Sequence, residues 1–174
     1  MHHEQTIEYV THQPMTADQV LEKAAEILAN KHLTSDAFTS SQATMDFLKF
    51  KLGRYEREVF AIMILNNKHQ LIEYSELFFG TINAASVYPR EVVKAVLNEN
   101  GAAVIFAHNH PSGETEPSQA DIAITKRLKE ALALIDVQVL DHIVIGDSAT
   151  SLATQQSIKA YADGATSFAE RGLL

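Results

Sequence analysis

Apolar residues near the N-terminus recur at intervals of three and four, at Val20, Leu21, Ala24, Ile27 and Leu28. This period is typical of an amphipathic helix and predicts one over residues 17–32. Thr16 and Gln19 form the pattern of a capping box at its start. After a polar break, a second helix is predicted over residues 42–52, ending near Gly53.

The pattern then changes to runs of β-branched and aromatic residues, at positions 58–65 and 71–79. Runs of this length and composition are typical of strands. The short polar segment 66–70 separates them. These residues therefore predict a β-hairpin.

Helices and strands alternate beyond the hairpin. The predicted elements are a helix from Pro89 to Asn98, a buried strand over 102–107, a Pro/Gly-rich loop over 109–117, a helix over 119–134 and a buried strand over 137–145. A hairpin followed by this alternation predicts an α/β fold, with a mixed sheet covered by helices. Residues 147–174 are expected to form a polar tail with a short helix near 152–161.

The composition limits the possible functions. With 174 residues, 46% of them hydrophobic, the chain is long enough to bury a core of its own. It has no cysteine, which excludes disulfide frameworks, thiolate zinc sites and cysteine nucleophiles. Histidine, with eight copies, is then the natural transition-metal ligand to examine.

Charge and hydropathy point to a cytoplasmic protein. No apolar stretch approaches the roughly 18 residues of a membrane span, and the N-terminus lacks the pattern of a secretory signal. The formal net charge is −8 at pH 7. Because sequence-independent binding to the nucleic-acid backbone needs a basic surface, we expect no direct nucleic-acid binding by this chain.

The residues with the clearest chemistry lie around the loop over 109–117, which follows the buried strand 102–107. His108 and His110 are two apart in expected extended backbone, so both imidazoles face one side. Ser118 begins the next helix and Asp121 lies in its first turn. If the loop brings Asp121 back beside the histidines, the three side chains form a site for a divalent ion. Zn²⁺ suits such ligands and would keep its fourth position open for water.

Each part of this pattern has a simpler explanation. A His-X-His pair alone is more often solvated or part of the core. Ser118 followed by Asp121 at the third position is ordinary helix N-cap chemistry. The two parts occurring together in one short stretch favour a metal site, and Ser118 can cap the helix while facing that site.

The same stretch resembles a known motif. His108-X-His110, seven residues, then Ser118-X-X-Asp121 looks like the JAMM motif of the JAB/MPN metalloprotease superfamily. The RadC-type branch of that superfamily is matched more fully, by His108-Asn109-His110-Pro111-Ser112-Gly113, Gly80-Thr81-Ile82, Pro89-Arg90-Glu91-Val92, Asp141-His142-Ile143 and Ser167-Phe168-Ala169-Glu170. The resemblance covers residues 36–147 and 166–174. It implies a three-layer α/β/α fold with a mixed sheet, like that of the cytidine deaminases.

The resemblance also implies roles for individual residues. Zinc would be bound by His108, His110 and Asp121. Glu58 matches the glutamate that serves as general base, and Ser118 matches the serine that stabilises the oxyanion. Glu56 stays open as an alternative base, because alternation along a strand places it on the same face as Glu58.

Other residues are left with two interpretations or depart from the family pattern. His142 is either a partner of a metal ligand or a buried core residue, and the core is the favoured interpretation. Tyr88 stands where this branch usually has histidine. Residues 152–164 lie between two Ala-Thr-Ser repeats and are predicted to be an insertion. The domain is placed at 36–174, after an extension at 1–35 with one helix, as in short RadC-like proteins lacking a helix-hairpin-helix domain.

These observations favour a zinc-dependent hydrolase of amide or isopeptide bonds, acting on a peptide or protein substrate. The alternative implied by the RadC name is a DNA-repair-associated factor that acts through partners or on nucleic acid. An inactive interaction domain is a third class, but it would be marked by lost ligands, and none is lost in this sequence. The sequence does not predict the substrate or the oligomeric state.

Overall fold

The computed structural model describes residues 13–16, 19, 20, 23, 27, 41–80, 86–146 and 164–174. The elements are α2 (Ser41–Leu52), β1 (Val59–Leu65), β2 (Leu71–Phe79), α3 (Pro89–Asn98), β3 (Ala103–His110), α4 (Gln119–Ala133), β4 (Gln138–Gly146) and β5 (Ala165–Ser167). The strands of this described part form one sheet in the order β2-β1-β3-β4-β5. Only the β3–β4 pair within it is parallel. The predicted mixed sheet is confirmed.

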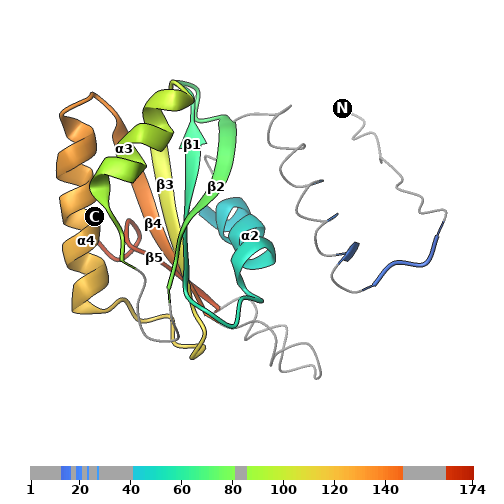
Figure 1. Ribbon diagram of the computed structural model, residues 1–174. Helices are drawn as coiled ribbons and strands as arrows, with labels where there is room; N and C mark the ends of the chain where they lie inside the picture. The colour runs from blue at the N-terminus through green and yellow to red at the C-terminus, as the bar shows by residue number, and fades with distance from the viewer. Residues whose placement is uncertain are drawn as a thin grey trace, which may run out of the picture.

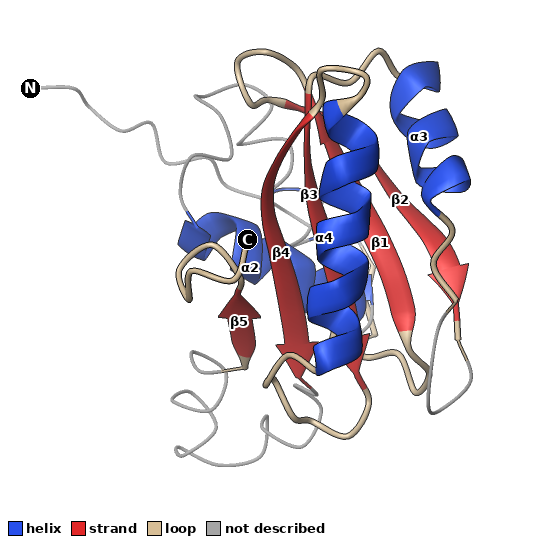
Figure 2. Ribbon diagram, turned by 90° about the vertical axis from the view of Figure 1, so that its left-hand side faces the viewer, coloured by secondary structure: helices blue, strands red, loops and turns tan. Residues whose placement is uncertain are grey.

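Helices cover both faces of the sheet. Figure 1 shows α2 on one face and α3 and α4 on the other, and Figure 2 shows α3 and α4 in front of the strands. The architecture is the expected three-layer α/β/α arrangement. No described helix combines the length and apolar character needed to cross a membrane.

Two hydrophobic cores lie on opposite faces of the sheet and share β1. Val59, Ala61 and Met63 pack on the α2 side. Phe60 and Ile62 pack on the side of α3 and α4. Because every β1 side chain is buried, its sequence is continuously apolar rather than alternating.

A bulge in β4 changes which of its residues face α4. Val104 pairs with Val139, but Ile105 pairs with Asp141, so Leu140 is an extra residue. Since successive strand side chains point to opposite faces, the extra residue reverses the alternation. Val139 packs on the α4 side before the bulge, and His142 contacts α4 after it.

The hairpin and the helices predicted over 42–52, 89–98 and 119–134 are confirmed, and two boundaries are corrected. β3 runs to His110 rather than ending at residue 107, because His108 pairs with Phe60 on one side and Val144 on the other. The connecting loop therefore starts at Pro111.

β5 was not predicted. It pairs with β4 and continues into a turn held by the Asp141 carboxylate, which accepts hydrogen bonds from Ser167 Oγ and the Ala169 amide.

Several predictions fall wholly or partly outside the described residues. The capping box at Thr16 and Gln19 is present, with reciprocal hydrogen bonds of 2.9 and 3.3 Å. Most of the predicted helix 17–32, the domain boundary at residues 35 and 36, and all of the predicted insertion 152–164 lie outside the described part of the chain. So does the predicted tail helix 152–161.

Candidate metal centre

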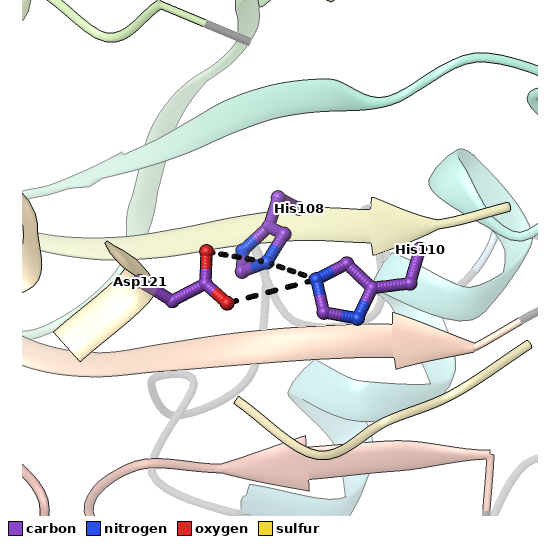
Figure 3. Close-up of side chains that lie close together, drawn as sticks. All are labelled: His108, His110 and Asp121. Carbon is purple, nitrogen blue, oxygen red and sulfur yellow. Dashed lines mark hydrogen bonds and ion pairs between the residues drawn. The ribbon is translucent and has the colours of Figure 1, made fainter. Parts of the chain in front are cut away.

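The three predicted ligands come together at one end of the sheet. His108 and His110 lie on the same face of β3, and Asp121 lies in the first turn of α4. Their candidate ligand atoms all lie within 4.8 Å of one another. Figure 3 shows the two imidazoles and the carboxylate pointing toward each other. His108 is fully buried, whereas His110 and Asp121 are partly exposed, so the group is reachable from one side.

Asp121 is fixed by the capping box that the sequence predicts. Ser118 Oγ accepts from the Asp121 amide at 3.1 Å. The Asp121 Oδ2 atom accepts from the Ser118 amide at 2.7 Å and from its hydroxyl at 2.6 Å. Asp121 Oδ1 then faces His108 Nε2 at 3.4 Å. The capping interaction thus occupies one carboxylate oxygen, Oδ2, which also lies 3.7 Å from His110 Nε2, and directs the other toward His108.

The charge of this carboxylate is stabilised by its neighbours. Burial by itself would raise the pKa of Asp121, but the neighbouring His108 and His110 rings and the Ser118 hydroxyl outweigh burial and hold that pKa far below its usual range. The same carboxylate raises the pKa of His110, against the opposing effect of burial. Asp121 is therefore present as an anion.

His110 is oriented by the loop that follows β3. Its Nδ1 lies 2.8 Å from the Glu114 carbonyl oxygen. A carbonyl can only accept, so Nδ1 carries the hydrogen and the neutral ring keeps Nε2 as an acceptor. Gly146 allows the loop to approach closely, since a Cβ there would lie 2.6 Å from the Gly113 carbonyl oxygen. The loop thereby turns Nε2 of His110 toward Asp121.

His108 has a partner that the sequence analysis placed in the core. Its Nδ1 lies 2.8 Å from His142 Nε2. The other nitrogen of His142, Nδ1, lies 2.6 Å from Thr125 Oγ1 in α4. Burial lowers the pKa of His142 well below its ordinary value, so this ring is neutral. His142 is both a core residue and a partner of a predicted metal ligand; the Asp141-His142-Ile143 match was the signal for it, and nothing marked Thr125.

Glu58 lies just before β1, near the triad. The register between β1 and β3 pairs Phe60 with His108, which brings the residues preceding β1 beside His110. The negative charge of Glu58 contributes to the raised pKa of His110. Glu58 is partly buried, whereas Glu56 is exposed. The catalytic roles given to Glu58 and Ser118 stay predictions.

The backbone around Glu58 is held by a residue that the sequence analysis did not single out. Asn109 is 3% exposed and points to the opposite face of β3 from the two histidines. Its side chain accepts from the Val59 amide at 2.8 Å and donates to the carbonyls of Tyr55 and Arg57 at 3.1 and 3.0 Å. These bonds secure the chain on both sides of Glu58.

The residues present fit a divalent transition metal. Two imidazoles and one carboxylate are ligands that Zn²⁺ accepts, and three protein ligands leave a coordination position for another molecule. The partners of the ligands, such as the Glu114 carbonyl behind His110, are those expected around a metal site. Fold and side chains together define an α/β domain with a candidate set of three metal ligands.

Comparison with known proteins identifies the family. The sequence profile of the RadC-like JAB domain matches residues 38–157. The chain belongs to this family.

Its relatives share most of its length. A UPF0758 protein of Vibrio cholerae serotype O1 is 62% identical over 148 residues, covering 85% of this chain and 94% of that protein. A second UPF0758 protein of that organism is 55% identical over 145 residues, covering 83% and 92%. A UPF0758 protein of Aeromonas hydrophila is 50% identical over 155 residues, covering 89% of this chain but 62% of the relative. These names state no activity, so the function is argued from the site.

Proposed function

We propose that this protein is a zinc-dependent hydrolase that cleaves an amide or isopeptide bond in a peptide or protein. The convergence of His108, His110 and Asp121 within 4.8 Å carries the proposal. The membership of the JAB domain family supports it, because metal-dependent amide hydrolysis is the activity that the motif implies. The partial exposure of His110 and Asp121 gives a substrate a side from which to approach.

The chain's own residues have separate tasks in this reaction. His108, His110 and Asp121 would hold the ion. When bound, Zn²⁺ supplies Lewis acidity, which lowers the pKa of water and polarises a carbonyl group. Glu58 takes the proton of the attacking water and returns it to the leaving amine. Ser118 exchanges its hydrogen bond with Asp121 Oδ2 for one to the developing oxyanion.

Metal analysis tests the ligand set. We expect the purified protein to hold about one zinc per chain, as a site with three protein ligands would. His108→Ala and Asp121→Ala should both lose the metal, because each removes a ligand. His69→Asn is the matched control, since His69 lies in the hairpin turn with a φ of 58°, a conformation that asparagine tolerates. Unchanged zinc content in both ligand variants would refute the site.

A peptide-library cleavage screen tests the reaction. Glu58→Gln should retain zinc and reduce kcat by about 100-fold or more, because it removes a proton acceptor without removing a ligand. Glu56→Gln is the paired variant, with the same chemical change two residues away. If Glu56→Gln is the inactive variant and Glu58→Gln is active, the base is Glu56. A wild-type protein that binds zinc but cleaves no amide bond in the screen would count against the hydrolase.

A further inference from the structure

A buried line of hydrogen bonds leads from α4 to the candidate metal centre. Thr125 Oγ1 lies 2.6 Å from His142 Nδ1, and His142 Nε2 lies 2.8 Å from His108 Nδ1. All three residues are at most 1% exposed. Because water does not reach them, each nitrogen and oxygen in this line must find its hydrogen-bond partner within the protein.

Such a line can be polarised in either of two directions. In the first, the Thr125 hydroxyl donates to His142, His142 donates to His108, and His108 Nε2–H donates to His110 Nε2, which is 3.0 Å away. In the second, the two bonds through His142 are reversed: His108 Nδ1–H donates to His142 Nε2, and His142 Nδ1–H donates to Thr125 Oγ1. Only the second direction leaves Nε2 of His108 unprotonated and able to bind a metal.

The position of the Thr125 hydroxyl distinguishes the two directions. Thr125 Oγ1 lies 2.6 Å from the backbone carbonyl oxygen of Asp121, one helical turn earlier in α4. A carbonyl only accepts, and a hydroxyl has a single hydrogen to donate. The Thr125 hydrogen is therefore used on Asp121, so the hydroxyl must accept from His142 Nδ1–H.

The packing around His142 keeps the ring in the plane that this line requires. Its ring stacks on Phe168 with centroids 4.7 Å apart. Phe60 and Phe106 contact it edge-on, at 5.5 and 5.9 Å. The β4 bulge at Leu140 is what places His142 on this face of the sheet.

We propose that Thr125 is a positioning residue which, through His142, fixes the proton of His108 on Nδ1 and keeps its Nε2 available to a metal ion. The inference rests on the metal site of the proposed function and explains why His108 Nε2 is available to bind a metal ion. Asp121 then contributes twice, as a ligand through its carboxylate and as the acceptor that orients Thr125 through its carbonyl.

The first test is the protonation pattern of the metal-free wild-type protein. Histidine labelled with ¹⁵N distinguishes protonated from unprotonated ring nitrogens in long-range ¹H–¹⁵N NMR spectra, and His108→Gln and His142→Gln assign the signals. We expect Nδ1 of His108 to carry a hydrogen and to donate it to His142. A His108 ring that carries its hydrogen at Nε2 and none at Nδ1 would overturn the proposal. This measurement needs no bound zinc, so it stands apart from failure of the metal site.

The second test uses substitutions at Thr125 and zinc affinity measured by chelator competition. Thr125→Val keeps the shape of the side chain but removes the hydroxyl, and should weaken zinc binding by about 10-fold or more and move the His108 proton toward Nε2. Thr125→Ser restores the hydroxyl and should restore both. Thr44→Val is the matched control, because Thr44 is 2% exposed in α2 on the other face of the sheet.

The control separates a positioning role from a merely structural one. Thr44→Val is expected to lower stability without changing zinc affinity or the His108 signals. A folded Thr125→Val protein with wild-type zinc affinity and an unchanged His108 pattern would refute the proposal. If Thr125→Val does not fold, the wild-type spectrum and Thr125→Ser still decide it.

Discussion

The two faces of β3 near its end both carry polar side chains, but these side chains find their partners in different ways. Asn109 on one face and His108 and His110 on the other are polar groups within an otherwise apolar sheet. Asn109 uses both of its N–H donors and its oxygen on nearby backbone. The histidines instead turn their Nε2 atoms toward each other and toward Asp121. A buried polar group paired within the chain stabilises the fold, whereas converging acceptors call for a cation from outside.

The largest effect on folding is expected on the Asn109 face. Asn109→Ala leaves one amide and two carbonyls without their partner, and should lower the free energy of unfolding of the metal-free protein by about 3 kcal/mol. Urea unfolding measures this. Asn66→Ala is the control, because Asn66 also makes three side-chain hydrogen bonds but lies in a turn open to water. Its expected cost is about 1 kcal/mol, and equal costs for the two variants would erase the contrast.

A smaller effect on stability is expected on the histidine face, and it depends on the presence of zinc. A ligand that binds only the folded state adds about 2.7 kcal/mol when its free concentration is a hundred times its Kd. For a domain of this size, zinc should then raise Tm by about 5–10 °C. Calorimetry with zinc and with a chelator should show this rise in the wild type and not in Asp121→Asn. Asp46→Asn in α2 should keep it; a rise that survives Asp121→Asn would place the stabilising ion elsewhere.

The smallest effect on stability concerns Ser118, which belongs to both the helix and the site. Ser118→Ala removes the cap and should cost about 1 kcal/mol, whereas Ser118→Asn keeps a capping oxygen and should cost little. If the hydroxyl stabilises the oxyanion, both variants lower kcat although only one is less stable. Peptide cleavage and urea unfolding on the same samples separate the two roles. Full activity in Ser118→Asn would show that Ser118 caps the helix but does not stabilise the oxyanion.

Local pattern was enough to predict most of the fold. The continuous apolar run of β1, the polar turn after it and Pro89 at the start of α3 each mark an element through its own residues. The triad was also predictable, because its three members lie on adjoining elements joined by one short loop. His108 and His110 are two residues apart on one strand, so their side chains point to the same face. Asp121 lies in the first turn of a helix, which also leaves its side chain little freedom of direction.

The features that were missed depend on contacts between distant residues. β3 looked shorter than it is, because polar His108 and His110 follow its apolar run, yet pairing with neighbouring strands continues. β5 is three residues long and is held through Asp141, far from it in sequence. The Asn109 bonds and the link from Thr125 to His142 likewise join separate elements. Residue type and spacing contain no signal for such partners.

The bulge at Leu140 bears on how far this site can be moved to another protein. A graft that copies the two histidines, the serine and the aspartate onto a regular sheet would reproduce the ligands. With regular alternation in the neighbouring strand, the position equivalent to His142 would point to the opposite layer. The sequence motif is therefore not a self-contained module: one irregular residue on the next strand belongs to the minimal unit that a designer would have to transfer.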